Sequence, residues 1–109
     1  GALTIVLPTI GDISKNLNSN SNSLGLRIPA LKLARDLLMQ TGPLATTSAN
    51  ISGQPPVRDA LEASIQFPGI PRLAPVPWPK SSGIASTVVE WKEGKWNLLR
   101  SGTVILNKK

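Results

Sequence analysis

Apolar stretches along the chain predict short strands at both ends. Residues 2–7 form a continuous apolar run rich in β-branched side chains, which predicts a buried strand closed by Pro8. Residues 24–28 predict a second short strand, which ends where Pro29 keeps the preceding residue extended. Near the other end, two apolar segments flank a Lys-Glu-Gly turn and predict a hairpin with strands at 86–91 and 95–99.

Helical periodicity predicts two helices between these strands. The first spans residues 30–41, and its apolar stripe consists of Ala30, Leu33, Ala34, Leu37 and Leu38. Gly42 supplies a stop for this helix and Pro43 blocks its continuation. A second helix is expected over residues 57–66. Because strands and helices alternate up to residue 66 and strands dominate afterwards, the pattern indicates an α/β fold with a mixed sheet.

The remaining segments are expected to be loops or marginal strands. Residues 14–23 are rich in Asn and Ser and predict a flexible loop. Residues 67–83 contain five of the ten prolines and predict an irregular segment. Residues 44–47 and 103–106 are further candidates for short strands.

Composition limits the chemistry that this chain can perform. The 109 residues fit one small domain or a part of a larger one, and the opening Gly1 without Met favours an expressed fragment. The chain has no Cys and no His, which excludes disulfides, thiolate chemistry and the commonest general base. The acidic residues show no paired spacing, so we expect no protein-built metal site, although a nucleotide can bring Mg²⁺ with it.

The formal net charge of +6 favours a phosphate-bearing partner such as a nucleotide, RNA or DNA. The alternative is a basic surface that serves solubility, with a tail that ends in Lys108 and Lys109. No apolar run approaches the roughly 20 residues that span a bilayer, and nothing is typical of a signal peptide. The expected location is therefore the cytoplasm, without membrane contact.

Three groups of polar residues are not explained by the apolar pattern. Residues 46–53 read Thr-Thr-Ser-Ala-Asn-Ile-Ser-Gly, and such hydroxyls, amide and backbone N–H groups can bind a phosphate or a ribose. Ser86 and Thr87 open a predicted strand, and Arg27 and Arg100 each lie at the end of one. Arginine presents a fork that suits carboxylate or phosphate. The alternatives are an ordinary Ser/Thr turn, strand residues and solvated surface arginines.

In order and spacing, these groups resemble the motifs of the Sua5/YrdC/YwlC family, the threonylcarbamoyl-AMP synthases. The matching segments, in chain order, are GALTIVLP (1–8), GLRIP (25–29), GPLATTSANISGQPP (42–56), SSGIASTVVEW (81–91) and LLRSGTV (98–104). The loop at 42–56 is the most specific of them. The resemblance implies a YrdC-like open twisted mixed sheet with helices, of which this chain is the C-terminal part.

The resemblance also implies an activity. Family members join L-threonine, bicarbonate and ATP into threonylcarbamoyl-AMP, with release of pyrophosphate, for the t6A modification of adenosine 37 in tRNA. Matched to the family's motifs, the nucleotide-binding residues would be Thr4, Ser48, Asn50 and Arg100. The threonine-binding residues would be Arg27 and Ser86, and Thr47 and Thr87 are weaker candidates.

Two departures from the family pattern qualify this expectation. Glu90 stands where the family usually has Asp, and nothing in the chain matches the family's Lys-x-Arg motif, which grips phosphates. We therefore expect these 109 residues alone to have weak or no synthase activity. The alternatives are an RNA-binding module for double-stranded RNA or tRNA, and a divergent paralogue that has lost the chemistry. Oligomeric state, and whether a further C-terminal domain follows, are left open by the sequence.

Overall fold

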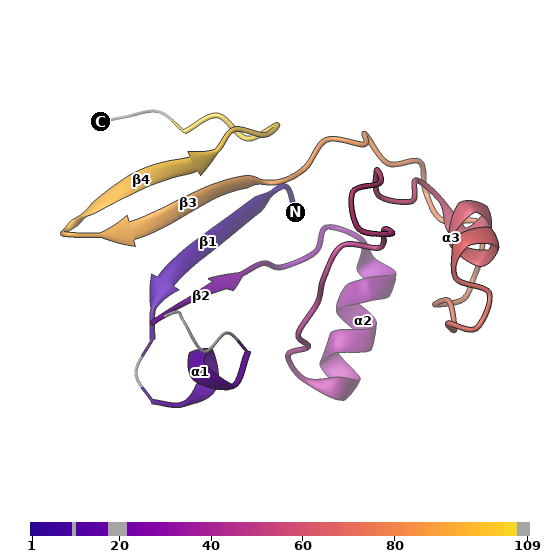
Figure 1. Cartoon of the computed structure of the whole chain (residues 1–109), viewed down its shortest axis with the longest axis horizontal. Helices are drawn as coiled ribbons and strands as arrows, with labels where there is room; N and C mark the ends of the chain where they lie inside the picture. Colours follow the sequence, from indigo (N-terminus) through magenta and orange to yellow (C-terminus); the bar gives the residue numbers. More distant parts are fainter. Residues whose placement is uncertain (10, 18–21, 107–109) are drawn as a thin grey trace. The chain divides into compact units, whose positions relative to one another are not determined.

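A computed structural model describes residues 1–9, 11–17 and 22–106 (Figure 1). The chain divides into two units, here called the sheet unit (Gly1–Pro43 and Ile84–Lys109) and the loop unit (Leu44–Gly83). The elements of the sheet unit are β1 (Leu3–Pro8), α1 (Ile13–Leu17), β2 (Ser23–Leu26), α2 (Lys32–Thr41), β3 (Thr87–Lys92) and β4 (Lys95–Arg100). The loop unit contains α3 (Ala60–Gln66).

The four strands form one open sheet in the order β2-β1-β3-β4 (Figure 1). β1 pairs with β3 in parallel, whereas the β1–β2 and β3–β4 pairs are antiparallel. The parallel pair joins segments from opposite ends of the chain, since Leu3 lies opposite Thr87. The predicted α/β fold with a mixed sheet is confirmed.

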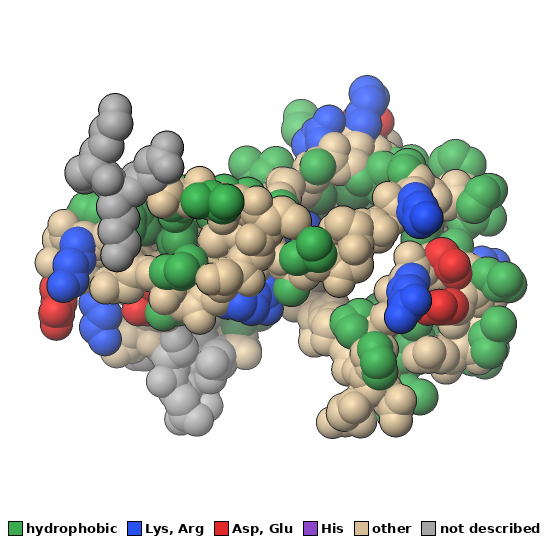
Figure 2. Space-filling view, turned by 90° about the horizontal axis from the view of Figure 1, so that it is seen from above, with side chains coloured by type: hydrophobic (Ala, Val, Ile, Leu, Met, Phe, Trp, Pro, Cys, Tyr) green, Lys and Arg blue, Asp and Glu red, His purple; other side chains and the backbone are tan. Residues whose placement is uncertain are grey.

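The sheet has one face made mostly of large apolar side chains. Strand alternation and register place on it Leu3, Ile5, Leu7, Leu24, Leu26, Val89, Trp91, Trp96 and Leu98. Val89 is only 3% exposed, but Trp96 and Leu98 at the edge strand are half exposed. Many large hydrophobic side chains lie at the surface (Figure 2). Among the described residues, Val89 and Ala60 are the two buried hydrophobic side chains, so backbone pairing contributes much of what holds the sheet unit together.

The hairpin of β3 and β4 follows the sequence prediction closely. Glu93 and Gly94 form its two-residue turn with φ of 55° and 74°, as a type I′ turn requires. Trp91 and Trp96 lie directly opposite each other, with ring centroids 5.0 Å apart and the planes at 65°. The two tryptophans therefore pack edge to face across the turn, and this pair adds to hairpin stability.

Helix α2 begins two residues later than predicted, at Lys32, because the backbone of Leu31 is still extended. Its first turn has no side-chain cap from Leu31. Instead, Arg35 donates hydrogen bonds to the carbonyls of Pro29 and Ala30, which precede the helix. At the other end Gly42 has a φ of 77° and its N–H donates to the Leu38 carbonyl (2.8 Å), as the predicted glycine stop requires.

Helix α3 begins at Ala60 rather than at residue 57 because Asp59 is its N-cap. The Asp59 carboxylate accepts from the Glu62 N–H (2.8 Å), and the Glu62 carboxylate accepts from the Arg58 N–H (2.8 Å). This exchange resembles a capping box displaced by one residue. Residues 67–83 contain neither helix nor strand, as predicted, but Trp78 Nε1 donates to the Leu73 carbonyl (2.8 Å) within this segment.

Four further expectations differ from the structure. The strand expected at 24–28 is observed at Ser23–Leu26, so residues 27 and 28 lie outside it. Residues 44–47 and 103–106 are not strands, because neither segment pairs with a strand among the described residues. The predicted loop at 14–23 is wrong where it overlaps all but the first residue of α1 and the first residue of β2, while residues 18–21 lie outside the described part. Within the part of the chain that is described, no helix is long and apolar enough to cross a membrane.

Candidate functional site

The sheet unit brings three of the predicted site residues into direct contact. The hydroxyl oxygens of Thr4 and Ser86 lie 2.7 Å apart, and Arg100 Nη2 donates to Ser86 Oγ (3.1 Å). Arg100 Nε also donates to the Ser86 carbonyl (2.9 Å). Thr4, Ser86 and Arg100 form a connected hydrogen-bonding group, called here the hydroxyl–arginine cluster.

Strand register explains why these side chains meet. Thr4 lies opposite Val88 in the parallel pair, so these two side chains point to the same face of the sheet. Ser86 is two residues before Val88, and its side chain therefore points to that face as well. The pairing of β3 with β4 shifts between Val88 and Val89, so that Leu98 lies opposite Val89 but Arg100 lies opposite Val88. A regular ladder would place Arg100 opposite Thr87, on the apolar face. The bulge therefore turns Arg100 to the face of Thr4 and Ser86.

The cluster leaves hydrogen-bonding capacity for a ligand. Ser86 is 6% exposed and holds the Nε edge of the Arg100 guanidinium. Arg100 itself is exposed, and its Nη1 makes no hydrogen bond within the described residues. A guanidinium fixed along one edge and open along another is suited to a carboxylate or phosphate oxygen.

Arg27 lies at the same end of β1 but makes a different contact. It directly follows β2, whose Leu26 lies opposite Ile5. Its Nε donates to the Gly1 carbonyl (2.6 Å), and it forms no hydrogen bond with the hydroxyl–arginine cluster in the described structure. Arg27 is exposed, so its guanidinium is a second cation available to a ligand near the start of β1.

Ser48 and Asn50 belong to the loop unit and form their own local network. Ser48 Oγ donates to Asn50 Oδ1, and Asn50 Nδ2 donates to the carbonyls of Ile51 (3.0 Å) and Gln54 (3.1 Å). The Gln54 N–H returns to the Ile51 carbonyl (2.8 Å) in a turn whose third residue, Gly53, has a φ of 80°. Asn50 thus holds the loop closed, while the Ser48 hydroxyl is exposed to solvent.

The two weaker candidates have contrasting environments. Thr47 is exposed and forms no hydrogen bond within the described residues. Thr87 is 1% exposed, and its hydroxyl donates to the Val104 carbonyl (2.8 Å) and accepts from the Val104 N–H (3.1 Å). The hydroxyl of Thr87 is therefore fully engaged by backbone.

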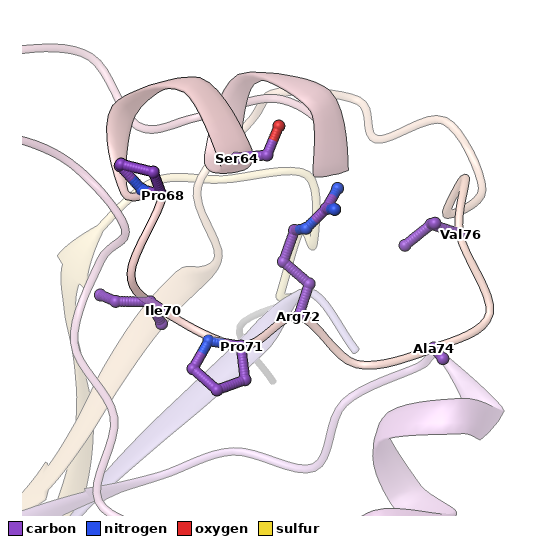
Figure 3. Close-up of a pocket in the computed structure, with 7 residues that line it drawn as sticks. All are labelled: Ser64, Pro68, Ile70, Pro71, Arg72, Ala74 and Val76. Atoms are coloured by element: carbon purple, nitrogen blue, oxygen red, sulfur yellow. The ribbon is translucent and has the colours of Figure 1, made fainter.

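A hollow of about 380 Å³ in the loop unit involves none of the predicted site residues (Figure 3). Its lining residues are Ser64, Pro68, Ile70, Pro71, Arg72, Ala74 and Val76. Arg72 reaches up from the chain toward α3, where its Nη1 donates to the Ala60 carbonyl (2.9 Å) (Figure 3). An isolated arginine in a proline-rich segment gives no sequence signal, so this contact was not foreseen. Its observed partner gives Arg72 a role in holding the irregular segment to the helix.

The described residues include no group of three or more His, Cys, Asp or Glu side chains placed to hold a metal ion. The cluster instead offers hydroxyls and guanidinium groups, which bind anions and polar substrates. The geometry thus defines a mixed α/β domain whose polar cluster lies where two parallel strands begin.

Comparison with known proteins identifies the family. The Sua5/YciO/YrdC family model, described as "Telomere recombination", matches residues 1–102, so the chain belongs to this family. A protein named threonylcarbamoyl-AMP synthase from Serratia proteamaculans is 43% identical over 68 residues, which cover 62% of this chain and 36% of that protein. Its Bacillus subtilis namesake is 32% identical over 108 residues, covering 95% of this chain and 31% of that protein.

The chain spans less than half the length of the curated relatives it matches. A Mycobacterium leprae relative, 33% identical over 104 residues, aligns with 95% of this chain but with only 47% of its own length. No solved structure matches the chain significantly. The recognised family and the mixed sheet agree with a partial YrdC-like domain.

Proposed function

We propose that this chain is part of a threonylcarbamoyl-AMP synthase, which joins L-threonine, bicarbonate and ATP and releases pyrophosphate. Membership of the family and the names of the relatives support the activity. The observation that carries the proposal is the hydroxyl–arginine cluster, because three residues from the two ends of the chain converge there.

In this proposal the cluster binds and orients the substrates. Arg100 directs its Nη1 edge, which makes no hydrogen bond within the described residues, at a phosphate of ATP. Thr4 contributes to the same nucleotide site. Ser86 and Arg27 bind L-threonine, Arg27 through the substrate carboxylate. The loop unit has its own nucleotide-binding candidates, Ser48 and Asn50, with Thr47 beside them.

The proposed chemistry needs no nucleophile or general base of the kinds that this chain lacks. The amino group of L-threonine and bicarbonate form a carbamate with loss of one water molecule. An oxygen of the carbamate then bonds to the α-phosphorus of ATP while the bond from that phosphorus to the pyrophosphate oxygen breaks. Negative charge that develops on the phosphate oxygens would be stabilised by guanidinium and hydroxyl donors, and alignment of the reactants would supply much of the rate. Mg²⁺ would enter bound to ATP, as part of the substrate.

The +6 charge supports a second interaction, with RNA or tRNA, and the proposed location is the cytoplasm. RNA binding through dispersed Lys and Arg would weaken steeply as salt rises. A nucleotide site would instead respond to substitution of individual residues in the cluster. Oligomeric state is not part of the proposal.

The experiment that tests the proposed activity follows pyrophosphate release by the intact protein, meaning the full-length synthase of which this chain is proposed to be part. The 109 residues alone are the comparison, and we expect them to release little or no pyrophosphate. We expect release that requires ATP, L-threonine and bicarbonate together, and a product with the mass of threonylcarbamoyl-AMP. Omission of L-threonine is the matched control. Pyrophosphate release that is independent of L-threonine, or no release with all three substrates present, would contradict the proposal.

A further inference from the structure

The segment that follows β4 crosses the start of β3 at very short range, and Gly102 makes this approach feasible. A Cβ atom on Gly102 would lie 2.5 Å from the Thr87 nitrogen, 2.6 Å from the Ala85 carbonyl oxygen and 2.7 Å from the Ser86 carbonyl carbon. Because all three are backbone atoms of one tightly placed segment, no side-chain movement can relieve the clash. Only glycine fits, and the reason is space rather than backbone dihedral angle.

The Thr87 side chain also holds the segment that follows β4. It does so at Val104, two residues after Gly102. Thr87 is 1% exposed, and its hydroxyl both donates to and accepts from the backbone of Val104 (2.8 and 3.1 Å). Its own N–H donates to the carbonyl of Ala2, the residue that precedes β1 (2.8 Å). Thr87 therefore joins the start of β1, the start of β3 and the segment after β4.

These contacts surround the residues of the hydroxyl–arginine cluster. Ser86 lies between Ala85 and Thr87, which the Gly102 backbone approaches, and Arg100 lies two residues before Gly102. Arg100 reaches both the carbonyl and the hydroxyl of Ser86 (2.9 and 3.1 Å). A shift of the segment at Gly102 would move the Arg100 backbone relative to Ser86 and stretch both bonds.

We propose that Gly102 and Thr87 form a latch that positions Arg100 on Ser86, so that the open edge of the guanidinium is directed at the nucleotide phosphates. The inference rests on the proposed function for the role of Arg100. Gly102 and Thr87 are positioning residues and touch no substrate. In this proposal Thr87 holds the segment that follows β4 and does not contact a ligand.

The test uses the intact protein with Gly102→Ala, Thr87→Val and Thr87→Ser, and Gly69→Ala as the matched glycine control. A Cβ at Gly69 meets no atom within 4 Å, so this control adds the same methyl group in open space. Thr87→Ser retains the hydroxyl and is the rescue for Thr87→Val. Two quantities are measured: solvent exchange of the Arg100 Nε–H by NMR without nucleotide, and the dissociation constant for ATP by calorimetry.

If the latch positions Arg100, Gly102→Ala and Thr87→Val speed the exchange of the Arg100 Nε–H and weaken ATP binding roughly tenfold, the scale of one misaligned charge-assisted hydrogen bond. Thr87→Ser and Gly69→Ala then remain close to wild type in both measurements. Thr87→Val removes a hydroxyl without adding bulk, so it reports on the latch even if Gly102→Ala fails to fold.

Unchanged Nε–H exchange in both latch variants would overturn the latch itself, whatever the nucleotide does. Faster exchange with unchanged ATP affinity would overturn its positioning role, provided that Arg100→Ala weakens ATP binding. If Arg100→Ala also leaves ATP affinity unchanged, Arg100 does not bind the nucleotide. The proposal that the latch directs its guanidinium at the phosphates is then refuted as well. The nucleotide-free measurement therefore separates the two failures.

Discussion

Removal of the Ser86 hydroxyl is expected to destabilise the protein as well as to disturb the site. Ser86→Ala deletes the contact with Thr4 at 2.7 Å and the contact with Arg100 Nη2 at 3.1 Å, and leaves the bond from Arg100 Nε to the Ser86 carbonyl intact. The first bond is worth about 1 kcal/mol. The second involves a charge but ends on an exposed arginine, so screening reduces it to about 1 kcal/mol. The free energy of unfolding should therefore fall by about 2 kcal/mol.

The assay is urea denaturation of the intact protein. The slope of the free energy of unfolding against urea concentration should be the same for the variant and for wild type. Ser64→Ala is the matched control, because within the described residues the Ser64 hydroxyl bonds only to the Leu61 carbonyl one turn earlier in α3 (2.7 Å), and because alanine favours a helix. We expect this control to remain within about 0.5 kcal/mol of wild type.

A double-mutant cycle isolates the Thr4–Ser86 bond. Thr4→Val and Ser86→Ala, alone and combined, should show a coupling free energy of about 0.5 to 1 kcal/mol, because each single substitution removes the same contact. Losses that add without any coupling would show that the two hydroxyls do not interact. That result would refute the convergence of β1 and β3 at the cluster.

Two further predictions concern the local structure on which the fold depends. Asp59→Ala should lower the free energy of unfolding by about 1 kcal/mol, since α3 loses the cap that accepts from the Glu62 N–H, and Asp59→Asn should retain most of it in thermal denaturation. Gly94→Ala should cost about 1 kcal/mol in the same measurement because Gly94 has a φ of 74°, whereas Gly94→Asn should cost less, and equal losses for both would contradict the turn assignment.

The elements with local signals were predictable from sequence. The apolar stripe and the Gly42 stop predicted α2, and the Glu93–Gly94 turn between alternating segments predicted the hairpin. The prediction of a strand at 44–47 was wrong because an apolar run becomes a strand only when another strand is present to pair with it. The prediction of a strand at 103–106 was wrong for the same reason. This segment contacts β3 through the Thr87 side chain and not through a ladder of backbone hydrogen bonds.

The candidate site depended on information that spacing does not contain. Thr4 and Ser86 are 82 positions apart, and only the parallel pairing of β1 with β3 brings them together. The resemblance to the family named them, but the bulge that turns Arg100 to their side has no sequence signature. The burial of Thr87 under the segment that follows β4 was likewise unpredictable. Threonine is common at the start of a strand, so its presence there carries no signal of burial.

The central claim is that the hydroxyl–arginine cluster binds the nucleotide, and calorimetric titration of ATP into the intact protein tests it most directly. Arg100→Ala should weaken ATP binding roughly tenfold to a hundredfold, and Arg100→Lys should restore only part of the affinity because it keeps the charge but loses the fork. Lys95→Ala removes the same charge from the other end of β4 and should leave binding nearly unchanged. Equal effects of Arg100→Ala and Lys95→Ala, or none from either, would contradict the account.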